Sequence, residues 1–160
     1  MHELYADPEL RAAVVARWGE EVAPGGVVDR GAVARRAFAD PGERAWLEGL
    51  IWPKVGERIA AWRAVESARE PPPPALVVEV PLLFESGMDA AFDATIAIVV
   101  DEEVREGRAR ARGHQAVDER TARQLSQYEK ARRATHALDN SSTIEDLERK
   151  LSAVLVKLGV

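Results

Sequence analysis

The sequence predicts an α/β domain in which helices cover both faces of a parallel sheet. Residues 76–80 and 95–100 are short runs rich in β-branched residues, without the polar alternation of a half-exposed strand. Apolar residues at helical spacing surround these runs, in the order helices first, then strand, helix and strand. The chain has 160 residues, of which 46% are hydrophobic, and this suits one compact domain.

Composition and charge exclude several classes of protein. The chain has no cysteine, which rules out disulfides and thiolate metal sites. Its first residues lack the basic start and apolar core of a signal peptide, and no apolar run is long enough for a membrane span. The net charge of −5 argues against a general nucleic-acid binder, although residues 104–133 are locally basic. We therefore expect a cytoplasmic protein that binds neither membrane nor nucleic acid.

Helices are predicted over most of the first 70 residues. Asp-Pro pairs at 7–8 and 40–41 have the residue types of a helix cap and first turn. The helices that they start continue to about residues 18 and 62, and a shorter helix is expected over 32–38. Pro53 lies inside the long pattern and predicts either a kink or a division into two helices.

Four prolines at 71–74 force an extended segment, which is either an interdomain linker or a helix-to-strand loop. We favour the loop, because the remaining chain continues one α/β layer. Helices are expected over 102–112 and 118–128, with a possible short strand over 134–138. A final helix follows a capping box made of Ser142 with Glu145, or of Thr143 with Asp146.

Three carboxylates lie at or just beyond the predicted strand ends, where open α/β sheets bind their ligands: Glu79, Glu85 and Asp101. Glu79 interrupts an apolar run, so its charge needs a partner, a hydrogen bond or a nearby metal. An acid at this place beside a phosphate site commonly holds the magnesium shell of a nucleotide enzyme. A helix cap or an arginine partner is the alternative.

Basic residues follow the second strand. Arg105, Arg108 and Arg112 are spaced at i, i+3 and i+7, which puts them within about 60° on one helix face. Such a row suits polyphosphate, because guanidinium groups bind phosphate oxygens in pairs. Arg120 and Arg123 could face the same volume. The alternative is a solvated face whose arginines pair with neighbouring glutamates.

Asn140 follows the possible third strand and could contact a base edge, although asparagine in a turn is more often a cap. The three histidines lack the spacing of metal ligands, so we assign none of them to a metal.

Taken together, these segments resemble the dephospho-CoA kinase family from about residue 18 to residue 151. Residues 80–85, Val-Pro-Leu-Leu-Phe-Glu, match a signature of that family, and residues 25–41 resemble its D-G-x-x-D-R segment. The other matches are the lid arginines at Arg108 and Arg112, the spaced Arg123, Gln127 and Lys130, and the V-I-D-N asparagine at Asn140.

The resemblance implies a P-loop kinase-like, three-layer α/β fold with a helical substrate-binding region. It implies transfer of the ATP γ-phosphoryl group, with Mg²⁺, to the ribose 3′-hydroxyl of dephospho-CoA, the last step of CoA synthesis. Arg108 and Arg112 would neutralise phosphate charge, Arg123 and Asn140 would bind ATP, and Glu79 would hold Mg²⁺ through water. The implied substrate residues are Asp29, Arg30, Pro81, Leu82 and Glu85.

The sequence departs from the family at Trp52, Thr135 and Ser142, where histidine, aspartate and glycine are usual. It also contains no G-x-x-x-x-G-K-[ST] phosphate cradle, which in the family precedes the segment matched here. We therefore expect an amino-terminally incomplete kinase fold with little activity of its own, whose strands invite a strand-completing partner. A non-catalytic binding or regulatory relative and a helical interaction module are the alternatives.

The expected organisation is a single dephospho-CoA kinase-like domain over residues 1–160, as a monomer or weak oligomer. Residues 1–70 would form the helical CoA side. Residues 75–160 would form a partial kinase core, with a lid around 102–128.

Overall fold

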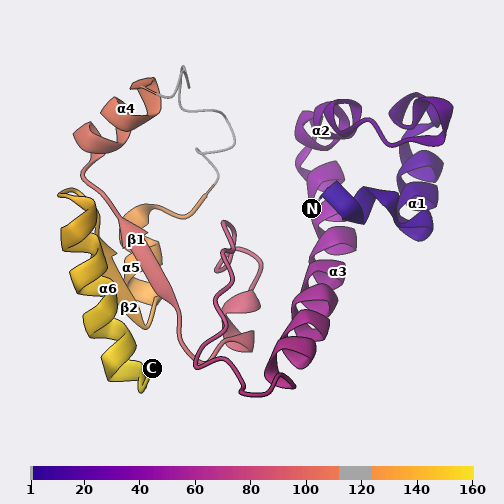
Figure 1. Ribbon diagram of the computed structural model, residues 1–160. Coiled ribbons are helices and arrows are strands. Elements are labelled where there is room, and N and C mark those ends of the chain that lie inside the picture. Colours follow the sequence, from indigo (N-terminus) through magenta and orange to yellow (C-terminus); the bar gives the residue numbers. More distant parts are fainter. Residues whose placement is uncertain (1, 112–123) are drawn as a thin grey trace. The chain divides into compact units, whose positions relative to one another are not determined.

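The structure is a computed structural model that describes residues 2–111 and 124–160 and divides into two compact units (Figure 1). The amino-terminal unit is Met1–Pro73 and the carboxy-terminal unit is Pro74–Val160. The boundary falls within the four prolines, where the sequence left a linker and a loop as alternatives. In the part of the chain described, no helix is both long and apolar enough to cross a membrane.

The amino-terminal unit is built from helices: α1 (Pro8–Trp18), α2 (Arg30–Ala39), α3 (Pro41–Ser67) and the short 3₁₀ helices η1 (His2–Ala6), η2 (Glu20–Val22) and η3 (Pro24–Gly26). Each α-helix begins after an aspartate whose carboxylate accepts hydrogen bonds from first-turn amides: Asp7, Asp29 and Asp40. Such caps satisfy amide groups that have no partner within the helix. The two predicted Asp-Pro starts are confirmed.

Pro53 does not divide the long helix, because α3 runs through it as one helix of 27 residues. Of the two predicted alternatives, a kink and a division into two helices, the structure excludes the division. Proline inside a helix removes one main-chain hydrogen bond and costs about 3 kcal/mol. Contacts on both sides of it keep the helix together. Ile51 is buried in the core, and the Lys54 Nζ lies 2.9 Å from Oδ2 of Asp7.

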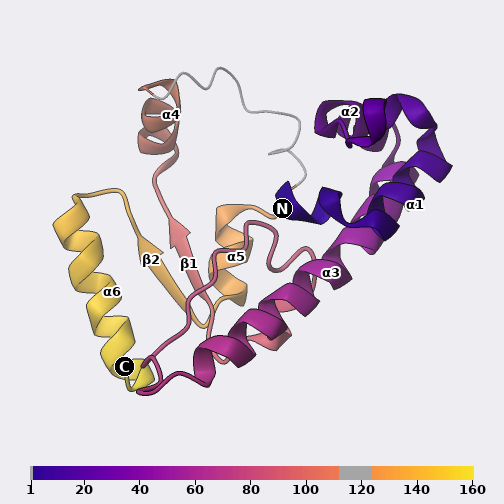
Figure 2. The same ribbon diagram turned by 45° about the vertical axis from the view of Figure 1, so that its right-hand side comes forward.

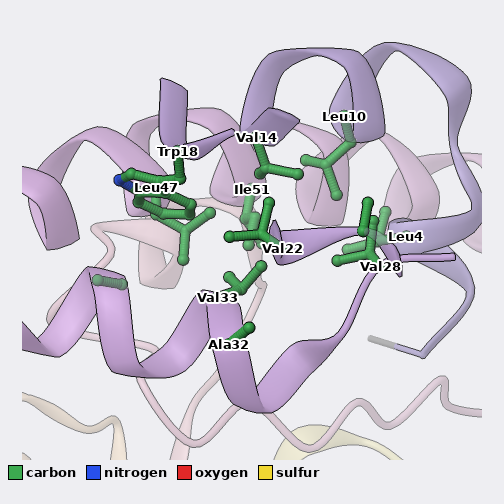
Figure 3. Packing of buried hydrophobic residues seen from close by; sticks show 12 residues of the cluster. Leu4, Leu10, Val14, Trp18, Val22, Val28, Ala32, Val33, Leu47 and Ile51 are labelled. Atoms are coloured by element: carbon green, nitrogen blue, oxygen red, sulfur yellow. The ribbon is translucent and has the colours of Figure 1, made fainter. Parts of the chain in front are cut away.

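Figure 3 shows the core of this unit, where apolar side chains from α1, α2, α3 and the short helices point toward one another. The largest fully buried side chains among the described residues are Leu10, Val14, Val22 and Val33. Each burial of this kind contributes about 1.5–3 kcal/mol to folding. Trp18 and Trp46 close the cluster at one end with ring centroids 5.0 Å apart in an edge-to-face arrangement.

The carboxy-terminal unit contains two parallel strands, β1 (Ile96–Val99) and β2 (His136–Asp139), with Ile96 opposite His136 and Val99 opposite Asp139. Its helices are η4 (Met88–Ala91), α4 (Glu102–Ala111), α5 (Gln127–Arg133) and α6 (Ile144–Leu158). Figure 2 shows the strand pair between α6 and α5. The predicted α/β class, the strands near 95–100 and 134–138, and the helix at 102–112 are confirmed.

Residues 76–80 do not form the strand that their composition predicts. They follow an irregular path, and Val77 is 82% exposed. A β-strand requires a neighbouring strand whose main-chain groups donate and accept hydrogen bonds along its edge. Among the described residues the only ladder joins β1 to β2. Without a partner strand, a β-rich sequence alone does not make a strand.

The remaining helix boundaries differ in detail from the prediction. Most of the helix expected over 118–128 lies outside the described residues. Residues 124–126 are described and are not helical, so the prediction is wrong there. A separate helix, α5, begins at Gln127 after a capping box of Ser126 and Glu129 that the sequence analysis did not identify. The final helix is capped by the second of the two expected pairs, because the Thr143 hydroxyl accepts from the Asp146 amide.

Candidate functional site

The carboxyl ends of β1 and β2 meet at one edge, and the chain there is fixed by hydrogen bonds beyond the strands. The Asn140 amide donates to the Val99 carbonyl over 2.7 Å, which extends the ladder by one residue. The Asp101 amide donates to the Ser141 hydroxyl oxygen over 2.8 Å. Asp101 and Asn140 therefore lie together at the edge where α/β sheets bind ligands.

Arg108 reaches this edge from α4. Its Nη1 donates to the main-chain carbonyl of Asn140 over 2.7 Å, and its Nη2 donates to that of Ser142 over 3.2 Å. A guanidinium group carries five N–H donors, so further hydrogens remain for a ligand. The structure thus joins two of the predicted residues, Arg108 and Asn140, through the asparagine's main chain.

The other arginines of the predicted row are not gathered at this edge. Arg105 forms an ion pair with Glu102 on its own helix, as the alternative interpretation expected. This pair raises the pKa of Arg105 and lowers that of Glu102. Arg112 and Arg123 lie outside the described residues.

A second cluster joins the loop at 81–87 to the start of α5. Oε1 of Glu85 accepts from the Leu125 amide over 2.9 Å and lies 3.1 Å from the Lys130 ammonium nitrogen. Lys130 also donates to the Pro81 carbonyl over 3.0 Å. The loop closes at Gly87, whose φ of 69° lies in the left-handed region that favours glycine.

The Glu85 carboxylate is largely buried, with 14% of its side chain exposed. Burial raises the pKa of Glu85, but hydrogen bonds from the Leu125 amide and from its own amide, together with Lys130, outweigh burial and lower the pKa overall. Its second oxygen, Oε2, is buried and accepts no hydrogen bond from the residues described. A buried acceptor without a donor is costly, so this oxygen offsets part of the stabilisation that the Oε1 contacts provide.

The remaining predicted residues are not part of either cluster. Glu79 is exposed on the irregular segment, so the cost expected for a charge inside a buried strand does not arise. Leu82 lies in the loop, where its carbonyl accepts from the Ser86 amide. Asp29 caps α2 by accepting from the Gly31 amide over 2.8 Å, and Arg30 is the first residue of that helix. Both belong to the amino-terminal unit.

The described residues give a limited test of whether Mg²⁺ fits. They contain no group of three His, Asp or Glu side chains that could hold a metal ion without help. Magnesium in kinases is usually held by one or two carboxylates together with substrate phosphates. An exposed carboxylate such as Glu79 meets that smaller requirement, whereas Asp139 is already engaged by Ser141 and Lys150.

The sequence identified Gln127 only as a match to the spaced Arg, Gln and Lys of the family, and the structure places it at the sheet. Its Oε1 accepts from the Val100 amide over 2.9 Å and its Nε2 donates to the Val100 carbonyl over 3.2 Å. That match was the signal in the sequence, and it did not reveal Val100 as the partner of Gln127. Thr135, one of the departures from the family pattern, exchanges hydrogen bonds with Thr95, amide to hydroxyl in both directions over 3.0 Å.

Comparison with known proteins gives consistent matches over this whole region. The family model described as dephospho-CoA kinase matches residues 5–146. The dephospho-CoA kinase of Deinococcus radiodurans is 41% identical over 142 residues, covering 87% of this chain and 68% of that protein. The dephospho-CoA kinase of Symbiobacterium thermophilum is 39% identical, covering 88% of this chain and 60% of that protein.

Among solved structures, the crystal structure of TT1252 from Thermus thermophilus matches with a TM-score of 0.69 and 34% identity. The match covers 94% of this chain and 81% of that one. The chain thus spans about two thirds of the length of the curated relatives described above.

Proposed function

The chain belongs to the dephospho-CoA kinase family, and we propose on this premise that it takes part in the phosphorylation of dephospho-CoA. In this reaction the γ-phosphoryl group of ATP passes to the ribose 3′-hydroxyl of dephospho-CoA, forming coenzyme A. The ribose oxygen forms a bond to the γ-phosphorus, the bond from that phosphorus to the bridging oxygen breaks so that ADP leaves, and the hydroxyl proton is released to water. Catalysis of this kind depends mainly on positioning and on stabilisation of phosphate charge.

The observation that carries the proposal is the meeting of Arg108 with Asn140 beyond the carboxyl ends of β1 and β2. Within the described residues, the hydrogen bonds of Asn140 use only its main chain. Its side-chain amide is thereby left for the adenine base, while spare N–H groups of Arg108 are left for phosphate. Arg112 and Arg123, which lie outside the described residues, would add charge and ATP contacts, as the family resemblance implies.

The proposed substrate contacts lie on both units. Pro81, Leu82 and Glu85 would contact dephospho-CoA from the carboxy-terminal unit, as the family resemblance implies. Asp29 and Arg30 would contribute from the helical unit. Mg²⁺ would supply charge neutralisation on the ATP phosphates, with Glu79 holding it through water.

At the level of organisation, we propose that residues 1–70 form the CoA side and residues 75–160 a partial kinase core with a lid around 102–128. We also propose a monomer or weak oligomer that works in the cytoplasm. The helical interaction module is no longer an alternative, because it required that the chain have no strands and β1 and β2 are present.

We expect the chain to bind dephospho-CoA but to hydrolyse or transfer little phosphate from ATP on its own. Residues 1–160 contain no G-x-x-x-x-G-K-[ST] sequence, whose amides and lysine hold ATP phosphates in P-loop kinases. We therefore expect the chain alone to bind dephospho-CoA and to turn over slowly, with the cradle supplied by a strand-completing partner. A non-catalytic relative that binds CoA precursors is the second candidate, and binding of dephospho-CoA without ADP formation would favour it.

The experiment is a pair of measurements on the full chain. Isothermal titration with dephospho-CoA tests binding, and a coupled assay for ADP tests turnover in the presence of Mg²⁺ and ATP. Binding with slow ADP formation is the expected result. Near-normal turnover would show that the missing cradle is not needed, and absence of binding would refute the proposed substrate.

A further inference from the structure

The junction between β1 and α4 is held at three consecutive residues. Val99 accepts from the Asn140 amide, Val100 exchanges two hydrogen bonds with the Gln127 side chain, and Asp101 donates to the Ser141 hydroxyl. These bonds come from two places in the chain: Asn140 and Ser141, directly after β2, and the start of α5. The direction in which α4 leaves the sheet is therefore set from outside the helix.

Gln127 occupies the middle of these three positions. Its amide accepts from Val100 N and donates to Val100 O, the exchange that a residue of a neighbouring strand would make. The side chain thus replaces a main-chain partner one residue beyond the strand. Loss of both bonds would leave two partly buried polar groups of Val100 without protein partners.

The main chain of Gln127 is held in place by its own contacts. It is the first residue of α5, whose capping box joins Ser126 to Glu129 in both directions. Lys130, one turn further on, is tied to Glu85 and to the Pro81 carbonyl. The loop at 81–87 therefore helps to fix α5, and Gln127 on α5 in turn fixes Val100, just before the start of α4.

Arg108 lies on α4, beyond the root that Gln127 holds. The helix starts with the Arg105 amide donating to the Asp101 carbonyl over 2.9 Å, directly after the clamped residue. A small rotation at Val100 would carry the Arg108 guanidinium away from the carbonyls of Asn140 and Ser142. We infer that Gln127 is a positioning residue, which orients α4 so that Arg108 faces the nucleotide. The inference rests on the proposed function for the identity of that nucleotide.

A purely packing role for Gln127 makes a different prediction. Methionine has nearly the same length and volume as glutamine but makes neither hydrogen bond, so Q127M keeps packing and removes the clamp. Q127E keeps the acceptor for the Val100 amide but sets an acceptor against the Val100 carbonyl. Q124M is the matched control, because Gln124 is exposed and lies just before α5.

The test uses the full chain and two-dimensional NMR with ATP and adenosine as separate probes. In Q127M, we expect amide exchange at Val100 to accelerate by about tenfold, the usual scale for one lost hydrogen bond. The side-chain signal of Arg108 should shift, and the dissociation constant for ATP should rise by about tenfold while that for adenosine stays unchanged. Q124M should leave all of these values unchanged, and Q127E should resemble Q127M.

The outcomes separate this inference from the proposed function. If Q127M retains wild-type exchange at Val100 or the wild-type Arg108 signal, Gln127 does not position α4. If those signals change but the ratio of ATP to adenosine affinity does not, Gln127 holds the helix without serving the nucleotide, and the inference fails. If the unmodified chain binds neither probe, the proposed ATP site fails, and exchange at Val100 with the Arg108 signal still decides whether Gln127 places the helix.

Discussion

The Glu85 carboxylate lies 3.1 Å from the Lys130 ammonium group and joins the loop at 81–87 to α5. Both side chains are mostly shielded, with 14% and 22% exposed. The same oxygen of Glu85 accepts from the Leu125 amide. One carboxylate therefore links a loop assigned to the substrate with the helix that carries Gln127.

Replacing Glu85 by glutamine should destabilise the carboxy-terminal unit. Glutamine keeps the shape but removes the charge, leaving Lys130 shielded without its counterion, at a cost of about 2 kcal/mol. The loss should appear in urea unfolding followed by NMR signals of β1 and β2. Glu79→Gln is the matched control, because Glu79 is exposed.

Tryptophan fluorescence gives an internal reference for that experiment. The chain's four tryptophans, at positions 18, 46, 52 and 62, all lie in the amino-terminal unit. Their unfolding transition should keep its midpoint in E85Q. If the signals of β1 and β2 give the same unfolding midpoint for E85Q and the unmodified chain, the ion pair does not stabilise the carboxy-terminal unit.

Stability of the carboxy-terminal unit should fall in acid. The pKa of Glu85 is lowered in the fold as described above, and hydrogen bonds from Ser141 and then Lys150 lower the pKa of Asp139. A carboxyl group with a lowered folded pKa stabilises the fold above its unfolded pKa and loses this contribution as pH falls through the folded one. The urea midpoint of unfolding, followed by the NMR signals of β1 and β2, should therefore decrease when the pH is lowered below about 4. The drop should be smaller in E85Q, and identical pH profiles for the two proteins would contradict the role of Glu85.

Arg108 should be needed for binding of the ATP phosphates. Arg108→Ala removes the two bonds to the carbonyls of Asn140 and Ser142 and the charge offered to phosphate, so ATP affinity should fall about 10- to 100-fold. Lysine should not restore it, because one ammonium group cannot reproduce the paired geometry of guanidinium. Arg110→Ala, an exposed position on the same helix, is the control. Equal ATP affinity in the two alanine variants, measured by titration calorimetry, would remove Arg108 from the site.

Asn140 should affect base selectivity but not the anchoring of α4. Arg108 and Val99 bind its main chain, which alanine retains. Asn140→Ala should therefore weaken ATP binding by about fivefold, with little change in binding of inorganic tripolyphosphate. Parallel titrations of both ligands check this, and an equal loss for both would show that the side chain does not contact the base.

The helix starts could be predicted because their signals are local. Asp7 and Asp40 cap the turns directly after them, so the residue types alone identify the boundary. The apolar run of β1 was likewise long enough to be recognised. Residues 76–80 carried the same signal but lack a partner strand among the described residues, and pairing is not a local property.

The sequence indicated which charged residues follow the strand ends. It did not indicate which residues those side chains contact. The sequence placed Arg108 on a helix after the second strand, but its attachment to main-chain carbonyls depends on how the loop after β2 turns. Gln127 pairs with a residue 27 positions away, and Ser141 with one 40 positions away. Neither the spacing nor the residue type could reveal such a partner.

The most direct test of the account is to map both ligands on the full chain by NMR titration. The account predicts that ATP shifts the signals of Asp101, Arg108 and Asn140, while dephospho-CoA shifts those of Asp29, Arg30 and residues 81–85. Failure of dephospho-CoA to bind, or shifts from both ligands confined to other residues, would contradict the assignment of this chain to the phosphorylation of dephospho-CoA.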